Sequence, residues 1–128
     1  MSIRIVRLGT ARAAGEGIRL GTVRRPPRGV PKSDFAKRDF YDVWLPLLSP
    51  SEELMKEGKT AGEERARAVF KKKFLAEMKQ PDPSRVLDLL AAFSHQTNFS
   101  LGCYCENEAR CHRSILREVL RERGAEVV

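Results

Sequence analysis

The chain has 128 residues, of which 41% are hydrophobic and 32% are charged. This length fits a single domain, and so large an apolar fraction can form a buried core, which excludes an intrinsically disordered chain. The 24 lysines and arginines exceed the 17 acidic residues and give a net charge of +7, which favours an anionic partner, either a small phosphate-bearing molecule or a nucleic acid. A basic, solvated surface explains the same charge equally well.

The cysteines and the apolar runs indicate the compartment. All three cysteines lie between residues 103 and 111, whereas secreted disulfide scaffolds spread more cysteines along the chain. Residues 1–4 do not open a signal peptide, and no apolar run approaches the roughly 18 residues of a membrane helix. We therefore expect a soluble, cytoplasmic protein without a membrane partner, while the sequence leaves its oligomeric state open.

Two strands are predicted at the start of the chain. Residues 3–8 alternate in polarity and are rich in β-branched side chains, which is typical of a strand, and Gly9 ends it. Residues 18–23 predict a second, weaker strand. Three prolines in residues 24–32 exclude regular structure there, so this segment, the basic loop, should be stiff and irregular.

Helices are predicted in the middle of the chain. Residues 33–34 can cap a short helix that places Phe40 and Trp44, four residues apart, on one face. Residues 49–52, Ser-Pro-Ser-Glu, form a capping box in which Ser49 caps the next helix.

Two apolar stripes with helical spacing follow a second capping box at residues 60–63, Thr-Ala-Gly-Glu. The first stripe stops before Pro81, and Asp82 followed by Pro83 should begin the helix of the second. The stripes consist of Ala66, Phe70, Phe74 and Met78, and of Val86, Leu87, Leu90 and Phe93.

The last section of the chain predicts a strand, a helix and a strand. Residues 99–105 form a short apolar run that is typical of a buried strand. The helical stripe consists of Ile115, Leu116, Val119 and Leu120. Gly124 should cap this helix, and residues 125–128 predict a closing strand. This order favours parallel pairing with a right-handed crossover. We therefore predict one α/β domain over residues 1–128, with a small, mostly parallel or mixed sheet flanked by helices.

The candidate site lies between the predicted buried strand and the last helix. Cys111, His112 and Arg113 should stand at the start of that helix, beyond the carboxyl end of the strand, where ligands collect in α/β sheets. Free N–H groups at a helix start attract anions, so we expect a lowered pKa for the Cys111 thiol. In this interpretation Cys111 is a nucleophile or redox thiol, Arg113 assists it, and Glu106 or His112 moves protons.

Three other interpretations of the cysteines compete with this one. Tetrahedral zinc takes four ligands, and the chain offers Cys103, Cys105, Cys111 and His112. Their C-x-C-x5-C-H order differs from the usual paired spacing, so we expect no metal and no cofactor. Cys103 and Cys105 are more simply core residues, since residues two apart share one face of a strand. Cys111 and Arg117 have the spacing of cysteine phosphatases, but no glycine lies between them to form a phosphate loop, so we treat the spacing as coincidence.

The basic loop is a candidate anion-binding segment. Arginine presents planar hydrogen-bond donors to phosphate, and proline lowers the entropic cost of ordering the loop. No aromatic side chain lies in the loop to stack on a base, which argues against binding of single-stranded nucleic acid. The candidate anion ligands are Arg24, Arg25, Arg28 and Lys32.

The sequence resembles the YeaO-like proteins, a family classed as a domain of unknown function. The likeness covers the basic loop, the tryptophan and Pro-Ser-x-Glu-Leu segment in residues 44–54, the basic and aromatic residues 70–78, and residues 103–113. The last segment resembles the family's Cys-x-Glu … Cys-His-Arg motif, but Cys105 stands where the family has glutamate, and Glu106 falls one position later. The resemblance implies an α/β fold and a cytoplasmic location, and it supplies no reaction.

The leading hypothesis is a small enzyme that acts on an anionic, phosphate-bearing substrate. Cys111, His112 and Arg113 would carry the chemistry, and Arg25 and Arg28 would bind the anion. The alternatives are a non-enzymatic module that binds nucleic acid or a nucleotide, and a zinc or thiol-redox protein. The sequence does not decide whether the protein is an enzyme.

Overall fold

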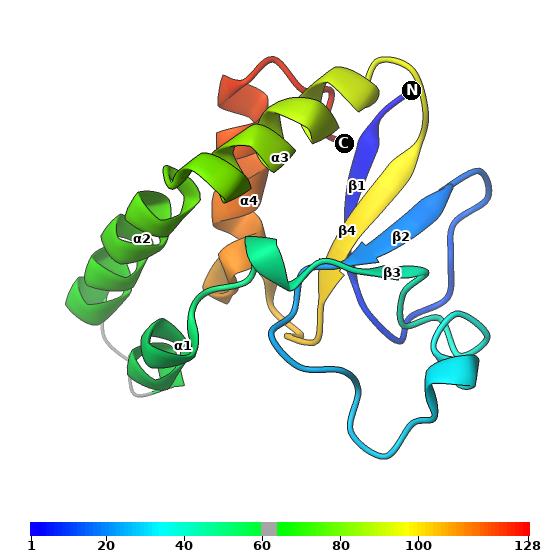
Figure 1. Cartoon of the computed structure of the whole chain (residues 1–128), viewed down its shortest axis with the longest axis horizontal. Coiled ribbons are helices and arrows are strands. Elements are labelled where there is room, and N and C mark those ends of the chain that lie inside the picture. Colours follow the sequence, from blue (N-terminus) through cyan, green and yellow to red (C-terminus); the bar gives the residue numbers. More distant parts are fainter. Residues whose placement is uncertain (60–63) are drawn as a thin grey trace.

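The computed structural model describes residues 1–59 and 64–128, and these contain a four-stranded sheet. Its strands are β1 (Ile3–Arg7), β2 (Ile18–Gly21), β3 (Val43–Trp44) and β4 (Phe99–Cys103). All pairings are parallel and the order is β1-β4-β2-β3, so β4 lies in the interior of the sheet (Figure 1). Every residue of β4 is buried, as the apolar run predicted. The predicted α/β architecture is thus confirmed.

The described helices gather on one side of the sheet (Figure 1). They are α1 (Glu52–Lys59), α2 (Glu64–Met78), α3 (Pro81–Phe93) and α4 (His112–Glu122). Their apolar stripes face the sheet because side chains three and four residues apart share one helix face. The buried cluster between helices and sheet includes Ile3, Phe74, Leu87, Leu101, Leu116 and Leu120. Phe93, predicted in a stripe, is instead exposed at the end of α3.

The opposite face of the sheet is covered by loops. Gly21 of β2 and Gly102 of β4 are partners in the parallel register. Successive residues of a strand face opposite sides of the sheet, and Leu101 points into the core on the helix side, so Gly102 and its partner Gly21 lie on the loop side. A methyl group on Gly21 would lie 2.4 Å from the Tyr41 ring, and one on Gly102 would lie 2.5 Å from the Leu8 side chain. The two glycines therefore let the loops that carry Leu8 and Tyr41 pack directly on the strands.

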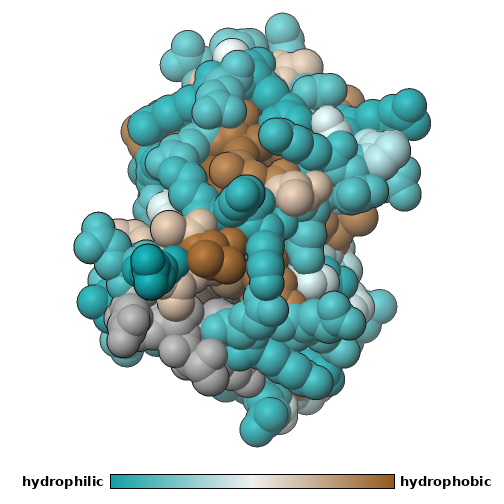
Figure 2. Space-filling model, turned by 90° about the vertical axis from the view of Figure 1, so that its left-hand side faces the viewer, coloured by the Kyte–Doolittle hydropathy of each residue, from teal (hydrophilic) through white to brown (hydrophobic). Residues whose placement is uncertain are grey.

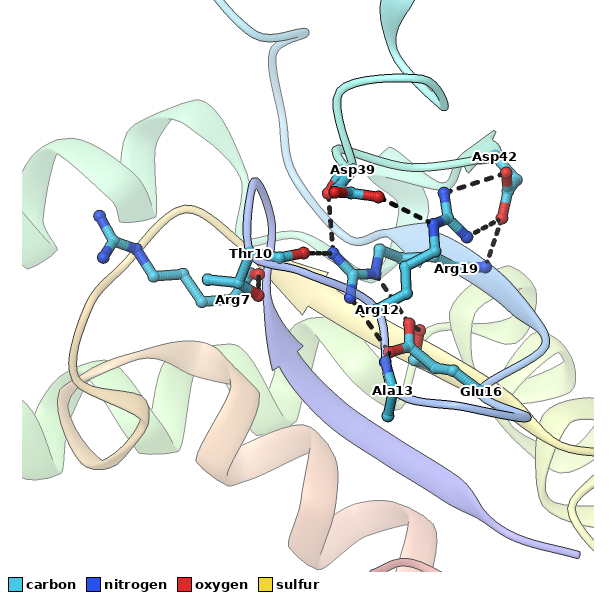
Figure 3. Close-up of polar contacts among 9 residues, drawn as sticks. Arg7, Thr10, Arg12, Ala13, Glu16, Arg19, Asp39 and Asp42 are labelled. Atoms are coloured by element: carbon cyan, nitrogen blue, oxygen red, sulfur yellow. Dashed lines mark hydrogen bonds and ion pairs between the residues drawn. The ribbon is translucent and has the colours of Figure 1, made fainter.

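A buried ion pair connects these loops to the sheet (Figure 3). Arg19, on β2, is fully buried and donates to both carboxylate oxygens of Glu16 at 2.8 and 3.1 Å. Its Nη1 group donates to the carbonyls of Thr10 and Asp39 at 2.8 and 2.7 Å. Ser100, on β4, donates to Glu16 at 2.6 Å. These hydrogen bonds satisfy a buried charge pair that the sequence analysis did not identify.

Residues 33–44 do not form the predicted helix. They contain a single 3-10 turn, η1 (Lys32–Asp34), and then β3, which includes Trp44. Asp39 adopts a left-handed φ of 62°, which breaks a helix before Phe40. The indole N–H of Trp44 donates to the Val23 carbonyl at 2.7 Å, so this tryptophan fastens the segment beside β2.

Two helices begin at residues other than those predicted. The N–H of Leu54 donates to the Ser51 hydroxyl at 3.2 Å, so α1 is capped by Ser51 and not by Ser49. Helix α3 already begins at Pro81, ahead of Asp82, with proline at its first position.

The end of the chain agrees only in part with the prediction. Gly124 follows α4 with a left-handed φ of 83°, as expected for a glycine that ends a helix. Residues 125–128 do not form the predicted strand, because they contribute only one parallel bridge, between Ile3 and Val127. The second predicted capping box, residues 60–63, lies outside the described residues.

No helix in the described part of the chain is both long and apolar enough to cross a membrane. The helix side of the molecule is largely hydrophilic around a central group of hydrophobic side chains (Figure 2). Ion pairs connect neighbouring helices: the Lys71 ammonium group of α2 lies 2.8 Å from a carboxylate oxygen of Glu118 on α4.

Candidate functional site

The carboxyl ends of β2 and β4 meet the start of α4. Strand β4 ends at Cys103, Thr22 directly follows β2, and Cys111 is the N-cap residue of α4. Between the two cysteines the chain turns through η3 (Glu108–Arg110), which Asn107 caps. The predicted arrangement, a buried strand that leads into a helix starting beside Cys111, is confirmed. Ligand sites of parallel sheets occur at this edge.

Two of the three thiols touch each other. The Sγ atoms of Cys103 and Cys111 are 2.7 Å apart, and both residues are buried. The backbone N–H of Cys105 donates to the Cys103 sulfur at 3.4 Å, while the Cys105 residue is exposed. The prediction that Cys103 and Cys105 share a buried strand face is wrong for Cys105, because β4 ends at Cys103 and the chain then turns.

His112 is held in one orientation behind the thiols. Its Nε2 lies 2.7 Å from the Thr22 carbonyl, which can only accept, so Nε2 carries the proton. Its Nδ1 is then a free acceptor, and it faces the Cys111 sulfur at 3.6 Å. Burial lowers the pKa of His112 to about 4, so the imidazole is neutral at pH 7. Phe74 packs edge-on against the ring, with centroids 5.6 Å apart.

The environment separates the pKa values of the three thiols. Hydrogen bonds with Cys103 and Cys111 hold the pKa of Cys105 well below its usual range, although burial opposes this. Hydrogen bonds with Cys105 and Cys111, together with burial, raise the pKa of Cys103. The contact with Cys103 lowers the pKa of Cys111, but Cys105 and burial outweigh it, so this pKa is raised. The predicted lowering for Cys111 is therefore wrong, because a buried thiol beside a thiolate resists ionisation.

Two arginines hold the turn that follows β4. Arg113 is only 3% exposed, and its Nη2 donates to the Cys105 carbonyl at 2.6 Å. Its buried Nε has no hydrogen-bond partner among the described residues. Arg7, at the end of β1, donates to the Tyr104 carbonyl at 3.3 Å. Positive charge therefore surrounds the turn that carries the exposed thiol.

Two other charged residues considered in the sequence analysis have their own partners. The side chain of Glu106 is 83% exposed and pairs with Arg7 at 3.7 Å. Arg117 donates to both carboxylate oxygens of Glu108 at 2.7 and 2.9 Å. This bidentate pair agrees with treating the spacing between Cys111 and Arg117 as coincidence.

The basic loop borders the site through its backbone. The Tyr104 hydroxyl donates to the Arg25 carbonyl at 2.9 Å. The Arg24 guanidinium donates to two backbone carbonyls just ahead of α1, and that of Arg25 pairs with Glu52 at 2.8 Å. Both side chains are thus engaged beside α1. Arg25 is nevertheless exposed, as are Arg28 and Lys32, and only the side chains of these last two cations of the loop have no ion pair or hydrogen bond among the described residues.

Thr22 is a site residue that the sequence analysis did not single out. Its hydroxyl donates to the Gly102 carbonyl at 3.0 Å, and its own carbonyl accepts a hydrogen bond from the Nε2–H group of His112. The available signal was its position, because it follows β2 at the sheet edge where Cys103 ends β4.

The cluster offers ligands for a metal ion as well as reactive sulfur. The Sγ atoms of Cys103 and Cys111 and a ring nitrogen of His112 all lie within 4.8 Å of one another, and the Nδ1 atom of His112 is 3.6 Å from the Cys111 sulfur. Thiolate and imidazole are the usual ligands of zinc and other thiophilic ions. The arrangement can therefore support nucleophilic, redox or metal chemistry.

Comparison with known proteins identifies one family. A family model described as the active DUF488-N3 subclade matches residues 3–124. No curated protein and no solved structure gives a significant match. The matched range includes the whole sheet and every residue of the thiol cluster.

Proposed function

This chain belongs to the DUF488 (YeaO-like) family, and we propose that it is an enzyme that acts on an anionic, phosphate-bearing substrate through a reactive thiol. One observation carries the proposal: two buried thiols, a buried imidazole and a buried guanidinium converge at the carboxyl edge of a parallel sheet, next to the exposed Cys105. Packing alone does not favour such a set, because burying an imidazole and a guanidinium costs desolvation energy.

Cys105 is the sulfur that best meets the needs of a nucleophile. An attacking thiolate must reach its substrate, and Cys105 is exposed whereas Cys103 and Cys111 are buried. Its lowered pKa supports the same assignment. We therefore assign the role of nucleophile to Cys105 and not to Cys111, the residue that the sequence favoured.

His112 and Arg113 support the thiol from the protein side. The proton on Nε2 of His112 is committed to the Thr22 carbonyl, so this imidazole positions the cluster rather than shuttling protons. Arg113 anchors the Cys105 carbonyl and brings a buried positive charge to the cluster. Glu106, exposed and paired with Arg7, is not required as a proton carrier in this arrangement.

The surrounding charge favours an anionic substrate. Arg7 and Arg113 both bind the backbone of the turn around Cys105. Arg28 is exposed on the basic loop, whose backbone contacts Tyr104 beside the thiols. Guanidinium groups bind phosphate in bidentate fashion, and a positive field raises the local concentration of such substrates.

Residue-resolved alkylation tests the proposal. Reduced protein is treated with iodoacetamide, and the modification of each cysteine is followed by peptide mass. We expect Cys105 to react fastest and inorganic phosphate to slow its reaction, because the anion would occupy the same site. Arg28→Ala should weaken this protection. Arg121→Ala, which removes an exposed arginine at the far end of α4, is the matched control and should leave it unchanged.

Turnover provides the second measurement. A panel of phosphate esters and nucleotides is incubated with the protein, and product release is compared with that of Cys105→Ser. Loss of turnover in the variant supports a catalytic thiol. If Cys105 is the slowest cysteine, or if phosphate does not change its rate, the proposal is refuted and a non-enzymatic nucleic-acid or nucleotide-binding module becomes the better interpretation.

A further inference from the structure

We propose that Cys103, Cys111 and His112 bind one thiophilic divalent cation, Zn²⁺, and that Cys105 completes a tetrahedral set of ligands. The ligand atoms of Cys103, Cys111 and His112 lie within 4.8 Å of one another, and the exposed Cys105, which does not belong to this compact group, would join it by a rotation of its side chain. Sulfur and imidazole nitrogen select zinc-like ions over Mg²⁺ and Ca²⁺, which prefer oxygen.

The separations of the ligand atoms are close to those of a zinc site. Zn–S distances of about 2.3 Å and Zn–N distances of about 2.0 Å place tetrahedral ligand atoms about 3.5–3.8 Å apart. The Cys111 sulfur and the His112 Nδ1 atom are 3.6 Å apart. The two buried sulfurs are closer, at 2.7 Å, and a rotation of one thiol that moves its sulfur by about 1 Å would admit the ion.

His112 has the hydrogen bonding of a metal ligand. Metal-binding histidines donate their other ring N–H to a carbonyl or carboxylate, which fixes the tautomer and the ring orientation. Here Nε2 donates to the Thr22 carbonyl at 2.7 Å, and Nδ1 is left facing the sulfurs. This observation is independent of the sulfur positions, since it concerns the opposite edge of a buried ring.

The charges balance around such an ion. Zn²⁺ with three thiolates and a neutral imidazole carries a net charge of −1. The buried Arg113 guanidinium lies against the Cys105 carbonyl at 2.6 Å, and Cys111 is the N-cap of α4, where the helix dipole favours negative charge. The N–H of Cys105 also donates to the Cys103 sulfur, a contact that stabilises metal-bound thiolates.

The fold removes the objection raised by the unusual sequence spacing. Cys103 belongs to β4 and Cys111 to the start of α4, so the turn between them brings together cysteines that the order C-x-C-x5-C-H alone does not relate. His112 points to the sulfurs because Thr22, from a different strand end, holds its ring.

The ion would also favour the thiolate form of Cys105. A coordinated thiol is deprotonated outright, so zinc would keep Cys105 as a thiolate at the exposed side of the cluster. This last step rests on the proposed function, in which Cys105 is the reacting sulfur, whereas metal binding itself does not depend on it.

Metal titration of the whole reduced protein tests the inference. Zn²⁺ is added in competition with a chromophoric chelator, and Co²⁺ is added separately as a spectroscopic probe. We expect one Zn²⁺ per chain, together with the sulfur-to-cobalt charge-transfer absorption and the intense d–d bands of a tetrahedral thiolate site. The cobalt spectrum of the wild-type protein needs no variant, so it is decisive even where a substitution disturbs folding.

Substitutions then identify the ligands. His112→Ala and Cys111→Ser should each weaken Zn²⁺ binding more than about 100-fold, since even changes outside the ligand set cost 10- to 100-fold. His95→Ala removes the only other histidine, which is exposed and bonded to the Gly124 carbonyl at 2.8 Å, and should leave affinity unchanged. Circular dichroism verifies that each variant is folded.

The outcomes separate this inference from the proposed function. Substoichiometric zinc, an octahedral cobalt spectrum, or equal losses in His95→Ala and His112→Ala would overturn the metal site. If zinc does not bind while phosphate still protects a fast Cys105, the inference fails and the thiol enzyme stands. If zinc binds but phosphate never protects Cys105, the metal site stands and the proposed function fails.

Discussion

Replacing Glu16 with glutamine should leave the buried Arg19 guanidinium without a counter-charge. The Glu16 carboxylate accepts two hydrogen bonds from Arg19, one from the Ser100 hydroxyl and one from the Ala13 N–H. A glutamine amide accepts at only one of its two terminal atoms, so part of this set is lost. Removing one partner of a buried ion pair costs about 3–5 kcal/mol, and we expect the free energy of unfolding to fall by about that amount.

Equilibrium unfolding in urea, followed by far-UV circular dichroism, measures the loss. Glu106→Gln is the matched control, because it removes an exposed carboxylate whose ion pair with Arg7 should contribute little. The double variant Glu16→Gln/Arg19→Met should regain part of the stability, since it also removes the orphaned charge. A loss below about 1 kcal/mol in Glu16→Gln would refute the role of Glu16 as the partner that neutralises Arg19.

The same carboxylate should make stability depend on acid pH. Burial alone would raise the pKa of Glu16, but hydrogen bonds from Arg19, Ser100 and Ala13 hold this pKa at about 2, against its ordinary value of 4.5. Because the pKa is lowered in the folded state, the stabilisation is present above about pH 4.5 and disappears as the pH falls toward 2. The difference corresponds to about 3 kcal/mol. Parallel stability curves for wild type and Glu16→Gln over this range would contradict the assignment.

Other substitutions examine the packing, the capping and the thiols. Gly21→Ala should lower the free energy of unfolding by about 1–3 kcal/mol in urea melts, because its methyl group would meet the Tyr41 ring at 2.4 Å. Ser51→Ala should cost about 1 kcal/mol in thermal unfolding, since its hydroxyl accepts the Leu54 N–H and donates to Glu77 at 2.5 Å. Ellman's reagent should titrate one fast thiol in the native, metal-free protein and all three after unfolding; in Cys105→Ser no fast thiol should remain.

The scaffold of the site was predictable because local patterns determine it. The apolar run that ends at Cys103 has the length and the bounded character of a buried strand, and β4 is buried at every position. The stripe from Ile115 to Leu120 fixes the face of α4, and with it the helix start beside Cys111. Both signals depend on side chains that are near one another in sequence.

The chemistry of the site was less predictable because it depends on contacts between distant segments. Cys105 is exposed because β4 already ends at Cys103. The sequence does not reveal this end, since the next two residues, a tyrosine and a cysteine, are as compatible with a buried strand as the residues before them. The orientation of His112 requires the Thr22 carbonyl, 90 residues away in the chain. The pair of Arg19 and Glu16 was missed because buried charges leave no periodic apolar pattern.

The departure from the family motif acquires a physical meaning once the cluster is assembled. Where the resemblance places a glutamate, this chain has Cys105, so a hard carboxylate is replaced by a soft sulfur beside the Cys103 and Cys111 thiols. A carboxylate there would act as a base or an oxygen ligand, whereas a third sulfur favours thiolate chemistry and thiophilic ions. Glu106, one position later, is 83% exposed and faces Arg7, so it does not restore the carboxylate to the cluster. Cys105 therefore brings sulfur, and not a carboxylate, to the cluster, and it does so from a turn that lies outside both β4 and α4.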